Sequence, residues 1–180
     1  TRRSSDLIGI IKSLEKKYGI EYLIQAFKML KDEYKDKKII LKIGGSGSQM
    51  DNLINLAKEL GIENDVQFLG RISPENVSKT FNSFDVTVFP SLREGFGVAA
   101  IESEACEVPV IVTNVGGHPE SVWENETGLI VEPKQPEEIK NAIIKLMEND
   151  ELRLNMGKKG RQFVRENYEV DRKSTRLNSS

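Results

Sequence analysis

The 180-residue sequence predicts an α/β fold: a doubly wound, Rossmann-like parallel sheet covered by helices on both faces. Two observations support this prediction. Short runs of Val, Ile and Leu alternate along the chain with segments whose apolar residues recur at helical spacing. Glycine-rich loops follow several of the apolar runs, and in open parallel sheets the loops after the strands carry the ligand site. We therefore expect a ligand site at one edge of the sheet.

The apolar runs define the expected strands and the periodic segments define the helices. The strands are expected at residues 7–11, 39–43, 66–69, 86–89, 110–112 and 129–131. The helices are expected at residues 20–34, 50–60, 98–107, 136–147 and 151–168. Gly61 should end the second helix, and Ser73 should cap a short helix that has Pro74 in its first turn.

Composition excludes several classes of function. The net charge is −2, so a nucleic-acid-binding role has no electrostatic footprint. No apolar run is long enough to cross a membrane. Cys106 is the only cysteine, so no internal disulfide can form, and this fits a reducing cytoplasm. Because its neighbours are largely apolar, we expect Cys106 to be a buried packing residue.

Both ends of the chain suggest an incomplete gene. The sequence starts at Thr1 without methionine and enters an expected strand almost at once. Residues 171–180 are polar and without periodicity, so we expect a disordered tail there. The same ten residues also resemble one translated frame of a DNA sequencing adapter, which would make them an artefact. Residues 1–170 are accordingly expected to form one domain.

Residues 94–102 carry the strongest functional signal. Glu94 opens the glycine-rich turn Gly95-Phe96-Gly97, and Glu102 lies in the helix expected from Val98 onward. The turn joins a strand to a helix, so unpaired backbone N–H groups point outward at the helix start and favour an anion. The flanking carboxylates suit sugar hydroxyls. The segment therefore indicates a nucleotide-sugar site.

The loop at residues 44–48 fits neither common nucleotide motif. A P-loop needs a lysine and a hydroxyl residue at its end, and Ser48 is followed by glutamine and methionine. A dinucleotide fingerprint starting at Gly45 has its second glycine at Gly47 but Met50 in the third place. A tight turn that lets the chain approach its neighbour explains these glycines equally well.

Several basic residues are ambiguous from sequence alone. Lys12 and Lys17 flank the turn after the first strand, where they are either solvated or directed at a diphosphate. Arg93 and Arg71 are open to the same two interpretations. His118 is the only histidine and follows a Gly-Gly loop, so a general base is conceivable but a nucleophilic triad is not. No spaced cluster of cysteine, histidine or acids indicates a metal site.

The segment from Pro90 to Gly117 resembles the retaining glycosyltransferases of the GT-B fold that carry two glutamates separated by seven residues. This is the group 1, family 4 type, which includes bacterial glycogen synthases, sucrose-phosphate synthases and phosphatidylinositol mannosyltransferases. The likeness extends over residues 8–168, with weaker marks at residues 44–47, 68–70 and 128–131 in the expected order. It implies that this chain is the C-terminal, donor-binding half of such an enzyme.

The resemblance also implies roles for individual residues. Glu102 would accept the ribose hydroxyls and Glu94 would contact the donor sugar. Lys12 and Lys17, five positions apart, would neutralise the diphosphate, although lysine replaces the usual arginine at position 12 and the inserted Tyr18 lets Lys16 compete. The remaining donor contacts would come from Gly45, Arg71, Ile72, Gly95, Phe96, Gly97 and Val98.

The implied partners are a UDP- or GDP-sugar donor, a saccharide or lipid-linked acceptor and an N-terminal domain of the same protein. The resemblance implies no metal or other cofactor, and it implies a cytoplasmic location, peripheral to a membrane if the other domain binds one. Alone, the chain would bind donor weakly and transfer nothing. A sugar-nucleotide epimerase of the same fold and a non-enzymatic α/β binding module remain as alternatives.

Overall fold

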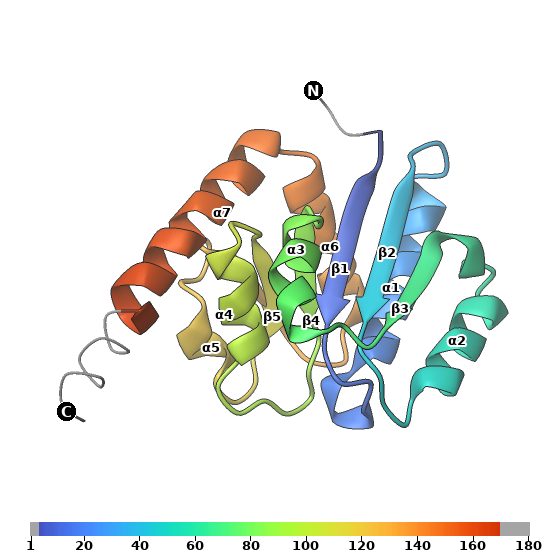
Figure 1. Cartoon of the computed structure of the whole chain (residues 1–180). Coiled ribbons are helices and arrows are strands. Elements are labelled where there is room, and N and C mark those ends of the chain that lie inside the picture. Colours follow the sequence, from blue (N-terminus) through green and yellow to red (C-terminus); the bar gives the residue numbers. More distant parts are fainter. Residues whose placement is uncertain (1–3, 170–180) are drawn as a thin grey trace.

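The computed structural model describes residues 4–169, which form one six-stranded parallel sheet in the order β3-β2-β1-β4-β5-β6 (Figure 1). The prediction for residues 171–180 lies outside the described residues. The strands are β1 (Asp6–Ile11), β2 (Ile39–Gly44), β3 (Val66–Gly70), β4 (Val86–Phe89), β5 (Val110–Thr113) and β6 (Gly128–Val131). The predicted fold class is confirmed, and each expected strand is present within one residue of its expected bounds.

Helices cover both faces of the sheet, as the strand composition requires. They are α1 (Ile20–Glu33), α2 (Met50–Glu59), α3 (Val77–Asn82), α4 (Val98–Ala105), α5 (His118–Ser121), α6 (Pro136–Met147) and α7 (Asp150–Val164). Short turns of other helix types are η1 (Lys16–Tyr18), η2 (Glu63–Asp65), η3 (Pro74–Asn76) and the π-turn η4 (Arg165–Glu169). Helix α1 packs against α2 and α6, while α4 packs against α3, α5 and α7.

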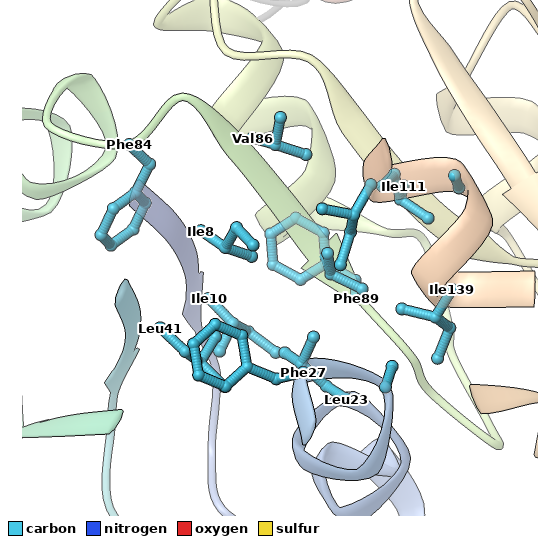
Figure 2. Packing of buried hydrophobic residues seen from close by; sticks show 14 of the residues in the cluster. Ile8, Ile10, Leu23, Phe27, Leu41, Phe84, Val86, Phe89, Ile111 and Ile139 are labelled. Carbon is cyan, nitrogen blue, oxygen red and sulfur yellow. The ribbon is translucent and has the colours of Figure 1, made fainter. Parts of the chain in front are cut away.

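The core lies between the central strands and these helices. Figure 2 shows Leu23 and Phe27 of α1 directed toward Ile10 of β1, and all three side chains are fully buried. Phe84 lies at the other face of β1, where Gly9 makes room for it: a Cβ at Gly9 would stand 2.3 Å from the Phe84 ring. A glycine inside a central strand is thus explained by one aromatic ring.

Three local predictions are corrected by the structure. Ser73 stands at the N-cap of η3 with Pro74 as its first residue, as predicted, but its side chain makes no capping bond to the backbone; its Oγ accepts a hydrogen bond from Asn76 Nδ2 at 2.8 Å. The helix from Val98 ends at Ala105, and Glu107 adopts a left-handed φ of 62°. The last helix is α-helical only to Val164 and continues as the π-turn η4 over Arg165–Glu169.

Cys106 is also corrected. It is half-buried rather than buried, and its thiol faces the Ser78 carbonyl at 3.8 Å on the outside of the molecule. It follows the last residue of α4, so it packs against the edge of the core and is only partly covered.

Candidate functional site

The order of the sheet makes the carboxyl ends of β1 and β4 the candidate ligand site. Strands β2 and β3 extend from β1 to one side and β5 and β6 extend from β4 to the other, and β1 and β4 pair with each other at the centre. The chain therefore leaves the carboxyl ends of these two strands toward opposite faces of the sheet. Open α/β sheets bind ligands outside such a divergence, and we call this position the β1–β4 crevice. Figure 1 shows the loops after β1 and β4 side by side at the lower edge of the sheet.

Lys12 and Glu94 meet across this crevice. Lys12 follows β1 and Glu94 lies in the loop after β4, and the Lys12 ammonium lies 3.0 Å from each carboxylate oxygen of Glu94. Their side chains are only 13% and 8% exposed. Lys12 is therefore not a solvated lysine, which corrects one of the two interpretations of this residue. Ser91 also donates a hydrogen bond to Glu94 Oε2 at 3.0 Å and so fixes the carboxylate.

Lys17 lies close to Lys12 through a shared aromatic ring. The Lys12 and Lys17 ammonium groups stand 4.4 Å and 5.1 Å from the centre of the Tyr18 ring. Cation–π attraction of this kind stabilises a cation by about 0.5–1 kcal/mol at an exposed site. The inserted Tyr18 thus gathers two positive charges at the mouth of the crevice.

The backbone of the loop after β1 is locked to the loop after β4. Leu92 N–H donates to the Lys17 carbonyl at 2.7 Å. Gly19 is left-handed, with φ 61°, and a Cβ there would lie 2.3 Å from the Pro90 carbonyl oxygen. Only glycine permits both the φ and the approach.

The glycine turn at residues 95–97 rests on the Gly116-Gly117 pair. A Cβ at Gly116 would lie 1.7 Å from the Glu94 carbonyl oxygen, and one at Gly117 would lie 2.1 Å from that of Gly95. The turn is consequently held by backbone-to-backbone packing. Gly117 N–H also donates to the Glu94 carbonyl at 3.3 Å.

The turn presents a set of unpaired donors at the start of α4. Within residues 4–169, the N–H groups of Gly95, Phe96, Gly97 and Val98 donate no hydrogen bond to the protein. Phe96 and Val98 are 83% and 56% exposed. A Cβ at Gly95 would meet nothing within 4 Å. The helix dipole and these open amides together favour an anion beside the two lysines.

The other predicted donor residues lie around this centre in different ways. Arg71 is exposed and Ile72 packs against Gly44, just beyond the end of β3. Gly45 has φ 126°, and its N–H donates to the Gly70 carbonyl at 2.8 Å. A Cβ at Gly45 would lie 1.9 Å from the Lys12 carbonyl oxygen, so this glycine supports the loop that carries Lys12.

Glu102 stands apart from the Lys12–Glu94 pair. It is exposed on α4 and borders a groove of 490 Å³ between α3, α4 and α7, lined by Ser78, Asn82, Glu102, Ala105, Cys106, Glu107 and Arg161. This groove is hollowed between helices and contains none of the glycine loops.

His118 is the residue of the site that sequence reasoning placed only loosely. It was expected in a loop, but it begins α5 and is 1% exposed. Its Nε2 lies 3.5 Å from Glu94 Oε2, and its Nδ1 lies 3.1 Å from the Thr113 carbonyl oxygen. Burial lowers the pKa of His118, and Lys12 lowers it further, while Glu94 and the Thr113 hydrogen bond oppose this.

Two negative findings apply to the described residues. No group of three or more histidine, cysteine, aspartate or glutamate side chains between residues 4 and 169 is arranged to hold a metal ion. In the same part of the chain, none of the helices combines the length and hydropathy that a bilayer span would need.

Comparison with known proteins defines the class to which this fold and site belong. Residues 2–163 match the family of glycosyl transferases group 1, and the chain belongs to that family. More particularly, it is a C-terminal domain of the retaining GT-B type, because the whole domain superimposes on the corresponding half of such enzymes.

Three relatives illustrate the match. The chain is 33% identical to a D-inositol 3-phosphate glycosyltransferase of Corynebacterium jeikeium over 84% of its own length and 37% of that protein. It is 32% identical to an N-acetyl-alpha-D-glucosaminyl L-malate synthase of Bacillus anthracis over 94% of its own length and 43% of that protein. It is 33% identical to an uncharacterized glycosyltransferase of Methanocaldococcus jannaschii over 92% of its own length and 42% of that protein. The chain thus spans less than half the length of these relatives.

Solved structures agree. The C-terminal domain of a glycosyl transferase group 1 protein from Francisella tularensis has a TM-score of 0.82 at 27% identity, covering 91% of this chain and 86% of that one. Sucrose-phosphate synthase from Thermosynechococcus elongatus gives 0.84 at 25% identity, covering 97% and 46%. An Anabaena protein crystallised with UDP gives 0.86 at 21% identity, covering 98% and 50%, and shows the common fold alone.

Proposed function

We propose that this chain binds a nucleoside diphosphate sugar of the UDP or GDP type. Within a complete enzyme, it would form the donor-binding half of a hexosyltransferase that retains the configuration of the sugar. The observation that carries this proposal is the convergence of Lys12, Lys17 and the unpaired amides of residues 95–98 at the β1–β4 crevice. Two cations and a helix N-terminus suit a diphosphate. The buried carboxylate of Glu94 beside them suits the hydroxyls of the attached sugar.

The chemistry of this arrangement is electrostatic. As the glycosidic bond breaks, negative charge develops on the departing nucleoside diphosphate and positive charge on the sugar ring. The ammonium groups and amide dipoles are already oriented before the reaction, so they stabilise the leaving group without reorganisation. The acceptor then attacks from the face that the leaving group vacates, which retains the configuration.

Glu102 and the loop after β3 complete the proposed donor contacts. Glu102 accepts the ribose hydroxyls, and Arg71 with Ile72 borders the base. An N-terminal domain supplies the acceptor pocket for a saccharide or lipid-linked saccharide at a cytoplasmic site. In this proposal, residues 1–170 form the donor domain alone, and the isolated chain binds donor weakly and transfers nothing.

Calorimetry tests the binding half of the proposal on the chain itself. UDP-glucose, GDP-mannose and their parent nucleotides are titrated into the wild-type chain and into Glu102→Ala. We expect weak heat with one class of nucleotide and a clear loss of affinity in Glu102→Ala. Absence of heat with every donor would contradict a preformed donor site.

Kinetics test the catalytic half in a complete enzyme that contains this domain. Lys17→Ala is expected to lower kcat by roughly a hundredfold, since one charged contact to a developing anion contributes a few kcal/mol. Glu102→Ala is expected to act chiefly on donor KM. Wild-type kinetics in both variants would overturn the assignment, and release of an epimerised donor without acceptor would favour an epimerase.

A further inference from the structure

His118 lies against the Glu94 carboxylate, which is paired with Lys12. The hydrogen bonds of His118 determine the tautomer of its ring. The Thr113 carbonyl oxygen, 3.1 Å from Nδ1, can only accept, so Nδ1 carries a hydrogen. The Thr113 hydroxyl cannot supply a hydrogen to Nδ1 instead, because it donates its own to the Ser91 carbonyl at 2.6 Å. In the neutral ring Nε2 is then an unprotonated acceptor.

In this arrangement two hydrogen-bond acceptors, His118 Nε2 and Glu94 Oε2, face each other. Nε2 of the neutral ring faces Glu94 Oε2 at 3.5 Å, a distance at which a protonated Nε2 would be attracted strongly. The contact is tolerated because Glu94 is already satisfied by Lys12 and Ser91. His118 is therefore a second, unused partner for the Glu94 carboxylate.

The charged groups around His118 are few. From the loop after β1 it faces Lys12, and from the loop after β4 it faces Glu94 and the backbone at Gly97. From β5 it meets Thr113, and in its own helix Ser121 donates to its carbonyl. Burial is the main factor that keeps the ring uncharged, and Lys12 is the charged neighbour that adds to it, so movement of that ammonium away from the ring favours its protonation.

We propose that Lys12 and His118 alternate as the partner of Glu94. When a donor diphosphate draws the Lys12 ammonium away, Nε2 of His118 takes one proton from solvent and donates it in a hydrogen bond to Glu94 Oε2. The imidazolium then holds the carboxylate in the orientation that the sugar needs. Donor binding is in this way coupled to proton uptake, and His118 is a positioning residue.

This inference rests on the proposed function, because the diphosphate must be the group that attracts Lys12. The balance of the step is simple: buffer loses one proton, Nε2 gains it, and no covalent bond other than N–H forms. The positive charge that leaves Glu94 with Lys12 is replaced by that of His118. The Glu94 carboxyl group thus keeps a cationic partner while the Lys12 ammonium contacts the diphosphate.

The coupling is measurable because His118 is the only histidine of the chain. Its ring proton resonance is followed by NMR as a function of pH in the wild type, in Lys12→Met and in Lys12→Gln. Both variants should raise the pKa of His118, since each removes a nearby like charge. Lys17→Met, which removes a charge from the same Tyr18 ring but not from Glu94, should give a distinctly smaller shift.

A second measurement follows the proton during binding. UDP-glucose and GDP-mannose are titrated calorimetrically in two buffers of different ionisation enthalpy; as diphosphate esters they do not titrate near neutral pH. Binding of either should take up as much as one proton per site, and His118→Gln should abolish the uptake while donor still binds.

The outcomes separate the two claims. An unchanged His118 pKa in folded Lys12→Met and Lys12→Gln overturns the alternation, and so does donor binding without proton uptake. Failure of every donor to bind overturns the proposed function, and the inference falls with it even where the Lys12 variants shift the pKa. Both a shifted pKa and proton uptake are required to support it.

Discussion

At the scale of single residues, the geometry of the site depends on glycines that have no side chain to contribute. Gly116, Gly117 and Gly19 each allow one backbone carbonyl to approach so closely that a Cβ would overlap it. The two loops of the crevice are thereby fixed to one another by atoms common to every residue. The side chains of Glu94 and Lys12, which we propose contact the donor, project from this frame.

Gly117→Ala and Gly95→Ala make a matched test of that frame. Gly117 has an ordinary φ of −83°, so alanine there causes overlap with the Gly95 carbonyl but no backbone strain. We expect Gly117→Ala to lose about 1–3 kcal/mol of unfolding free energy, as overpacking does. Gly95→Ala, which meets open space, should leave the thermal midpoint close to that of the wild type.

Chemical denaturation of the two variants is the measurement. Equal stability of both would mean that the turn is not supported by the Gly116-Gly117 pair.

The sequence could predict which residues belong to the candidate site better than it could predict which residues they contact. Glu94 and the glycines were found because strand, turn and helix signals surround them in one continuous stretch. The Lys12–Glu94 pair joins residues 82 positions apart, so no local pattern reveals it. The position of His118 was missed for the same reason. The sequence shows that a histidine follows Gly117, but its burial against Glu94 depends on three separate elements.

At the scale of elements, helix α4 carries an unusual residue toward α7. Glu104 is fully buried, and neither of its carboxylate oxygens has a hydrogen-bond partner within residues 4–169. Burial raises its pKa to about 9, and the Thr127 hydroxyl offsets this only in part. That hydroxyl accepts from the Trp123 N–H at 2.9 Å and donates its own hydrogen to the Trp123 carbonyl at 3.5 Å, so it does not satisfy the Glu104 carboxyl group.

The stability of the domain should therefore fall as pH rises. A carboxyl group with a folded-state pKa of about 9 and an ordinary value of 4.5 stays protonated in the fold while the unfolded chain ionises. Its contribution is unaffected in acid and is lost progressively between these two values, at roughly 1.4 kcal/mol per pH unit. At pH 7 this amounts to about 3 kcal/mol.

Glu104→Gln tests the effect, because it is isosteric and cannot ionise. Its unfolding free energy should exceed that of the wild type at pH 8 and approach it at low pH. Glu59→Gln, an exposed position on α2, serves as the control and should leave the pH profile unchanged. Parallel profiles for Glu104→Gln and the wild type would show that the buried carboxyl group does not titrate as we expect.

Two glycines of α7 give a second test at this scale. A Cβ at Gly157 would lie 2.1 Å from the Glu107 carbonyl, whereas one at Gly160 would make ordinary contact with the Glu104 side chain at 3.4 Å. Alanine is favoured over glycine in a helix by about 1 kcal/mol. We expect Gly160→Ala to stabilise the domain and Gly157→Ala to destabilise it, and thermal unfolding of both variants decides.

The helices themselves were predictable because apolar periodicity extends over many residues, but their ends were not. Helix α4 ends two residues before its predicted end because Glu107 takes a left-handed φ. A left-handed φ is expected from sequence at glycine or asparagine, so a glutamate does not indicate it. The π-turn after α7 likewise has no periodic signature.

At the scale of the whole molecule, the strand order accounts for the location of the site. Alternating strands and helices predicted the doubly wound sheet, and the rule that ligands bind beyond the carboxyl ends of strands predicted the edge where the candidate site lies. The central pairing of β1 with β4 then selects one point on that edge. Sequence could not select it, because strand order depends on contacts between distant segments.

The central claim is that the crevice between β1 and β4 holds the diphosphate of a sugar nucleotide. Amide NMR of the labelled 180-residue chain during titration with UDP-glucose and GDP-mannose tests it most directly. Our account predicts that the largest shifts fall on the N–H groups of Gly95, Phe96, Gly97 and Val98 and on the loop that carries Lys12 and Lys17. Shifts confined to the groove between α3, α4 and α7, or none with either donor, would contradict it.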